Sequence, residues 1–156
     1  MYHYTECGLV NVWLANGYNE KKTAYGKAVS IDDADGLHCV LAMAVVNKQG
    51  RVTGKELRFL RVLLEMSQAG LAELLGATEQ SVSLWERTGR VPKPIDAMVR
   101  MLVLERLKKD TSHVRRVIDR INAAEGLTRR RIVASEKRNK WTSTIEAESV
   151  EEAVTA

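Results

Sequence analysis

The stretch SQAGLAELLGATEQSVSLWE, residues 67–86, holds two short helical patterns with only Gly-Ala-Thr between them. Two helices joined by so short a turn must cross closely. Such a crossing needs a small residue at the contact and a turn residue that can adopt positive φ. Ala72 and Gly76 meet these needs, and Val82 supplies a branched apolar side chain on the second helix. The sequence therefore predicts a tightly packed helical pair.

The second helix of this pair carries almost no apolar stripe and exposes short polar side chains. Such a face is what a helix needs to enter the major groove of DNA. Gln80 can pair with adenine through its amide, and Glu79 can accept a hydrogen bond from a cytosine amino group. The alternative for both residues is a solvated first helical turn, where acidic side chains favour the helix dipole.

This region resembles the Cro and phage-repressor type of helix-turn-helix family over roughly residues 54–108. The family run SQ..LA..LG....S.S.WE.G..P is nearly complete in SQAGLAELLGATEQSVSLWERTGRVP. One departure is that Arg87 and Thr88 both stand between Glu86 and Gly89, where the family usually has a single residue. The resemblance therefore implies a DNA-reading helix at 78–87, followed by a turn that is one residue longer.

By position, the resemblance implies that Gln68 touches the phosphate backbone or an adjacent base. The front of the next helix would read bases, and basic side chains near its ends would meet phosphates. Trp85 is expected to pack in the core, and Glu86 to form a structural ion pair with Arg61. The expected DNA-binding residues are Gln68, Thr78, Glu79, Gln80, Ser81, Ser83, Arg87, Arg90 and Lys93, with Arg58 as a further basic candidate.

Capping signals divide the middle of the chain into four helices. Thr53 with Glu56 reads as a capping box, Ser67 and Thr78 cap the next two helices, and Pro94 suits the first turn of a fourth. The apolar residues expected to face inward are Leu57, Leu60 and Leu64 on the first helix, and Met98, Met101, Leu102 and Leu107 on the fourth.

The first fifty residues predict a small α+β unit. Asn16-Gly17 is a strong hairpin signal, so residues 10–15 and 18–23 are expected to pair, with a third strand at 25–31. Asp33 or Asp35 then caps a helix. Its expected apolar positions, spaced at i, i+3, i+4, i+7 and i+8, are Leu37, Val40, Leu41, Ala44 and Val45.

The rear of the chain predicts a helix at 112–124, with Val114, Val117, Ile118 and Ile121 on one side. Short extended stretches are expected from 131 to 145, with a hairpin around residues 137–139, and the acidic end is expected to fray. The fold class is thus α+β, mainly α. The expected domains are an N-terminal unit (1–50), a DNA-binding bundle (51–110), a dimerising or packing segment (111–145) and a tail (146–156).

The N-terminal part contains four potential metal ligands, His3, Cys7, His38 and Cys39, but they form no C-x2-C pair. The segment GLHCVLAMAVV resembles a degenerate form of the zinc-binding half of MqsA-type antitoxins, in which paired cysteines hold the metal. Here the second cysteine of each pair is absent, so no metal and no cofactor are predicted. Cys39 is instead expected to pack on the apolar side of its helix.

Charge and motif content favour a binding protein over an enzyme. Residues 51–141 hold 20 of the 24 Lys and Arg residues, a distribution that suits a polyanionic partner. No phosphate loop, nucleophile elbow or zinc-protease motif occurs, so the chain is expected to be no enzyme. No long apolar run and no signal peptide occur either, which predicts a cytoplasmic protein, associated with the nucleoid when bound to DNA, without membrane contact.

Two functions fit these patterns. The first is a sequence-specific transcription regulator, a repressor that binds a double-stranded operator as a homodimer. The second is an antitoxin of the HigA or MqsA type, which binds and neutralises a partner toxin and represses its own operon. The dimer would form through the 112–124 helix or through the N-terminal sheet. The alternative for the 112–124 helix is that it packs back on its own domain.

Overall fold

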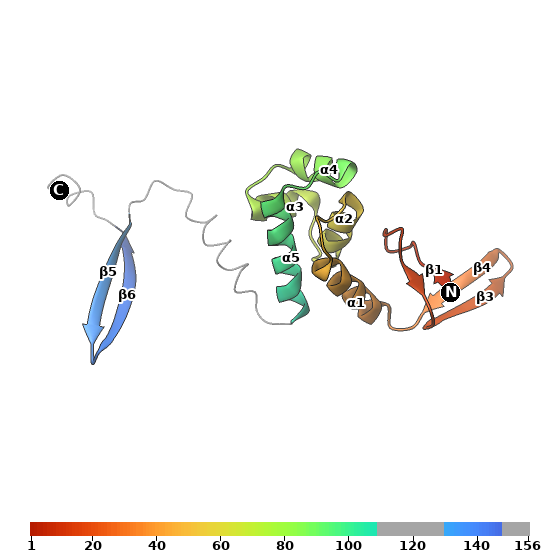
Figure 1. Cartoon of the computed structure of the whole chain (residues 1–156), viewed down its shortest axis with the longest axis horizontal. Coiled ribbons are helices and arrows are strands. Elements are labelled where there is room, and N and C mark those ends of the chain that lie inside the picture. Colours follow the sequence, from red (N-terminus) through yellow and green to blue (C-terminus); the bar gives the residue numbers. More distant parts are fainter. Residues whose placement is uncertain (109–129, 148–156) are drawn as a thin grey trace. The chain divides into compact units, whose positions relative to one another are not determined.

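In the computed structural model, residues 1–108 and 130–147 are described, and they belong to two separate compact units. These residues form five helices and three two-stranded antiparallel sheets (Figure 1), which confirms the α+β, mainly α fold class. Among them, no helix combines the length and the apolar character needed to cross a membrane. The predicted helix at 112–124 and the tail beyond residue 147 lie outside the described residues.

Four of the five helices of the first unit begin at predicted caps, and the fifth has Pro94 in its first turn and no side-chain cap. Their bounds are α1 Ala34–Asn47, α2 Gly54–Leu63, α3 Gln68–Leu75, α4 Glu79–Thr88 and α5 Lys93–Leu107. The side chains of Asp33, Thr53, Ser67 and Thr78 each accept a hydrogen bond from a backbone N–H in the first turn of α1 to α4. Each cap satisfies a donor that the helix itself leaves without a partner.

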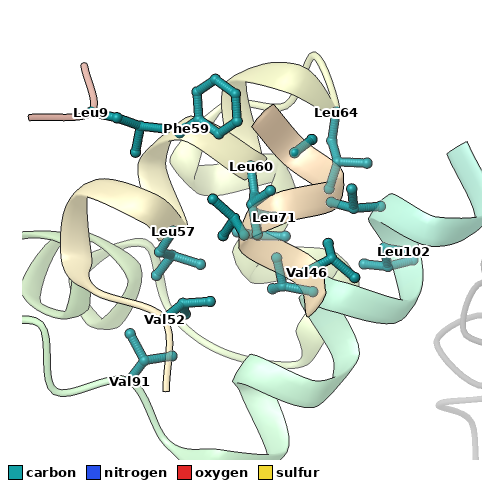
Figure 2. Packing of buried hydrophobic residues seen from close by; sticks show 14 of the residues in the cluster. Leu9, Val46, Val52, Leu57, Phe59, Leu60, Leu64, Leu71, Val91 and Leu102 are labelled. Atoms are coloured by element: carbon teal, nitrogen blue, oxygen red, sulfur yellow. The ribbon is translucent and has the colours of Figure 1, made fainter. Parts of the chain in front are cut away.

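A continuous apolar core joins the N-terminal segment to the helices. Leu57, Leu60, Leu71 and Val82 are fully buried, as Figure 2 shows for the first three. Tyr4, Leu9, Val12 and Leu14 belong to the same cluster. The predicted inward positions Leu64 and Leu102 are buried, and Met98 and Leu107 pack against the core. Met101 was also expected to face inward, but it is exposed. Val99 and Val103 are the fully buried residues of α5.

A buried ion pair connects the chain on both sides of the predicted domain boundary at residue 50. Asp96 accepts hydrogen bonds from the backbone N–H of Val52 (3.2 Å) and from Arg100 (2.6 Å). Arg100 also donates to the carbonyls of Val46 (3.1 Å), Lys48 (2.7 Å) and Gly50. Residues 1–50 therefore share a core with the bundle and do not form a separate unit.

The predicted hairpin around Asn16-Gly17 is wrong in its pairing. The strands are β1 Tyr2–His3, β2 Trp13–Leu14, β3 Tyr18–Thr23 and β4 Gly26–Ile31, and β2 pairs with β1 while β3 pairs with β4. Gly17 does adopt positive φ (78°), but this turn joins two different sheets. The competing β3–β4 hairpin closes over two residues and aligns six residue pairs, and this longer ladder satisfies more backbone groups.

Helix α1 packs on the core with only part of its predicted apolar face. Its buried residues are Ala42, Val45 and Val46, and the predicted positions Leu37 and Leu41 are partly buried against the core. The predicted positions Val40 (67%) and Ala44 are exposed, and so is Cys39. The helix contacts both α2 and α5, and the small Ala42 side chain permits close approach of its neighbours. Cys39 is therefore not a core residue.

The second unit contains the hairpin that the sequence suggested. Strands β5 (Arg130–Lys137) and β6 (Lys140–Ala147) pair along their whole length. The turn residues Arg138 and Asn139 have φ values of 55° and 60°, as a type I′ turn requires. The side chain of Trp141 on β6 is 73% exposed within this unit.

The capping box of α2 should make stability depend on pH. Burial of the Glu56 carboxyl raises its pKa, but hydrogen bonds from Lys48 (2.5 Å) and Thr53 outweigh this and hold the pKa below the ordinary value of 4.5. Because a lowered folded-state pKa stabilises the fold above the unfolded value, this contribution is lost as the pH falls through the folded pKa.

Replacing Glu56 with Gln removes the charge and keeps a side chain that suits the capping box. We expect the free energy of unfolding to fall by about 1 kcal/mol at about pH 7, and the difference from the unsubstituted protein to shrink at about pH 3.5. Urea unfolding at both pH values measures this, and an equal difference at both would contradict it.

Candidate nucleic-acid interface

Helices α3 and α4 meet through a turn that the sequence specifies. Gly76 adopts the left-handed conformation (φ 67°), and the backbone N–H of Ala77 donates to the carbonyl of Ala72 (2.8 Å). Ala72 is 3% exposed and Val82 is fully buried at the crossing. The predicted roles of these residues are confirmed, and α4 is held with one side packed and the other free.

The position of α4 depends on an ion pair that links three helices. Arg61 on α2 donates to both carboxylate oxygens of Glu86 on α4, at 2.6 and 3.3 Å, and to the carbonyl of Met66 at 3.0 Å. Gln68 on α3 donates to the same carboxylate at 2.8 Å. The side chains of Arg61 and Glu86 are only 12% and 7% exposed. The predicted ion pair is confirmed, and Gln68 was not foreseen as part of it.

Glycine at the start of α2 allows α4 to approach closely. A Cβ atom on Gly54 would lie 2.2 Å from the backbone oxygen of Glu86 and 3.0 Å from that of Trp85. This contact could not be predicted from the sequence, because it joins residues 32 positions apart. Residues of the three helices line a cleft: Gly54, Lys55, Arg58, Arg61, Gln68, Ser83, Glu86 and Arg87.

Some of the predicted DNA-binding residues already have partners. Thr78 is the N-cap of α4, and its hydroxyl accepts from the Ser81 backbone N–H (3.1 Å) and contacts the Ser81 hydroxyl (2.9 Å). Gln68 has one amide hydrogen committed to Glu86 and a second left over. Thr78 and Ser81 therefore hold the first turn in place, and Gln68 can still donate to a phosphate.

The remaining predicted residues lie along α4 and just beyond it. Glu79, Gln80 and Arg87 are exposed, and Ser83 is half-buried. Helix α4 runs to Thr88 and ends at Gly89 (φ 72°). The prediction of a longer turn after this helix is therefore wrong, because the additional residue before Gly89 extends the helix. Arg90 is exposed in the linker to α5, and Lys93 is the exposed first residue of α5.

The linker that carries Arg90 is fixed at its centre. Val91 is fully buried, and Arg51 donates to its carbonyl oxygen at 3.2 Å. Arg90 and Lys93 therefore flank an anchored residue. Sequence reasoning missed Lys55, an exposed cation that lines the cleft together with Arg58. Their i, i+3 spacing after the capping box was the available signal, since such residues share a helix face.

Within the described ranges, no group of three or more His, Cys, Asp and Glu side chains comes close enough to hold a metal ion.

Comparison of the chain with protein-family models, with curated proteins and with solved structures finds no match in any of the three.

Replacing Gly54 with Ala should separate α2 from α4. The added methyl group meets backbone atoms that cannot move independently, so we expect a loss of about 2 kcal/mol in the free energy of unfolding. Gly70→Ala in α3, where the nearest atom is the Ser67 hydroxyl at 3.2 Å, serves as the control and should change stability by less than about 1 kcal/mol. Equal effects in urea unfolding would refute the close contact.

Proposed function

We propose that this chain is a sequence-specific transcription regulator that binds double-stranded DNA, and that it acts as a dimeric repressor with α4 in the major groove. The observation that carries the proposal is the outward side of α4. It presents exposed polar side chains on a helix fixed to its neighbours by a buried ion pair. A rigid support of this kind lets short side chains reach base edges in one geometry.

The charges around α4 support the same function. Lys55, Arg58 and Arg87 are exposed and line one cleft beside the helix, and within residues 1–108 none of the three forms an ion pair. Arg90 and Lys93 add two further exposed cations next to the end of α4. Cations beside a reading helix and just beyond its end can contact the phosphates that border the groove.

A dimer follows from the energetics of recognition. One helix with three or four short side chains discriminates few base pairs, at about 1–3 kcal/mol for each good bidentate contact. This is too little against the many competing sites of a genome, and two copies on a near-palindromic operator roughly double it. The two reading helices would lie about 34 Å apart, one duplex turn.

A second candidate function is to bind and neutralise a partner toxin, with repression of its own operon. An exposed apolar groove formed by α1 and α5 favours it; the groove is lined by Cys39, Val40, Met43, Leu104, Leu107 and Lys108. Exposed apolar patches often mark protein contacts. Retention of random duplex DNA by the immobilised protein at physiological salt supports the regulator, and retention of one lysate protein without DNA supports the toxin-binding protein.

The specificity test uses Gln80, which is exposed in the first turn of α4. After selection of a preferred site from random duplexes, Gln80→Ala should weaken binding to that site by about 1–3 kcal/mol and leave binding to unrelated DNA nearly unchanged. Electrophoretic mobility shift titrations measure both affinities. An equal loss on both duplexes would show that Gln80 reads no base.

The phosphate-contact test uses Arg87 and Lys93. Replacing either with Gln should reduce the slope of log K against log salt by about 0.9, because one phosphate contact is lost. Lys22→Gln on the β3–β4 hairpin is the control and should leave the slope unchanged. A variant at Arg87 or Lys93 that retains the full slope would place that residue away from the DNA.

A further inference from the structure

The outward side of α4 contains one large apolar side chain. Leu84 is 48% exposed, although its neighbours on the helix surface are polar. At about 100° per residue, Gln80, Leu84 and Arg87 fall within about 60° of one another. This arc lies nearly opposite Val82, which is fully buried at the crossing with α3. Leu84 is thus closer to the centre of the exposed face than the half-buried Ser83.

The chemistry of the major groove leaves one base feature that suits such a side chain. Leucine has no donor or acceptor, and the polar edges of guanine, cytosine and adenine would lose water against it without gaining a partner. The C5-methyl group of thymine is the apolar group that the groove presents. Burying one methyl group between two apolar surfaces is favourable.

We propose that Leu84 is a specificity-determining residue that contacts a thymine methyl group, in a base pair within about two steps of the one that Gln80 reads. The distance follows from the helical rise, which is about 6 Å over four residues. The proposal rests on the proposed function, since it needs α4 in the major groove. It adds an apolar contact to the hydrogen bonds that the polar residues of α4 would make with bases.

The test replaces thymine with deoxyuridine, which removes only the methyl group. The probe is the duplex selected from a random library with the unsubstituted protein, with each thymine replaced in turn. We expect one position in each half-site at which loss of the methyl group weakens binding about fourfold. Leu84→Ala should bind the thymine duplex about as weakly as the unsubstituted protein binds the deoxyuridine duplex, and should no longer distinguish the two.

Val62→Ala is the matched control, because Val62 is an exposed aliphatic residue (58%) on α2; it should retain the full discrimination. The proposal is overturned if Leu84→Ala still distinguishes thymine from deoxyuridine, or if no thymine position is sensitive. It is also overturned if Leu84→Ala instead lowers self-association and leaves DNA affinity unchanged. Failure of the unsubstituted protein to prefer any duplex would reject the proposed function itself, and this proposal with it.

Discussion

The ion pair between Arg61 and Glu86 is the interaction on which the arrangement of the helices depends. It joins α2 to α4, and Gln68 extends it to the first turn of α3. Burying such a pair costs solvation, and removal of one partner from a buried pair typically destabilises a protein by about 3–5 kcal/mol. The geometry here offsets that cost, because Glu86 accepts three hydrogen bonds and Arg61 also donates to the Met66 carbonyl. The orientation of α4 is consequently fixed by charge as well as by apolar packing.

Two glycines make this arrangement possible. Gly54 lets the start of α2 lie against the backbone of α4, and Gly76 makes the turn from α3 in the left-handed conformation. With its inner side held by Val82 and Glu86, α4 presents its other side to solvent, beside the cations of α2 and of the linker to α5. If DNA is the ligand, the helix is preorganised, and little conformational entropy is lost when it binds.

The features that were predicted correctly from the sequence depend on residues close together in the chain. The caps at Thr53, Ser67 and Thr78 each accept a hydrogen bond from the backbone N–H three residues later, so they can be recognised in the sequence without knowledge of the fold. The hairpin prediction failed although the true pairing is also local, because the β3–β4 hairpin, which closes over two residues, competes with the one expected at Asn16-Gly17. On α1, Leu37, Leu41 and Val45 lie on the core side as predicted. Val40 and Ala44 are exposed, because the buried side of the helix is set by its contacts with the distant helices α2 and α5. The Gly54 contact and the Arg100 network join residues more than thirty positions apart. At the candidate site, the polar residues of α4 were identified from the sequence. Lys55 was missed although its i, i+3 spacing from Arg58 was an available signal, and Leu84 was identified only from its exposure in the structure.

We propose that the outward side of α4 is the surface that meets DNA. Amide chemical shifts, recorded by NMR while the selected duplex is added to the full chain, test it without any substitution. We predict that the largest changes fall on residues 79–88, with smaller ones at Gln68 and at residues 90–93. Changes concentrated instead on the exposed groove of α1 and α5, around Val40 and Met43, with α4 unaffected, would contradict the claim.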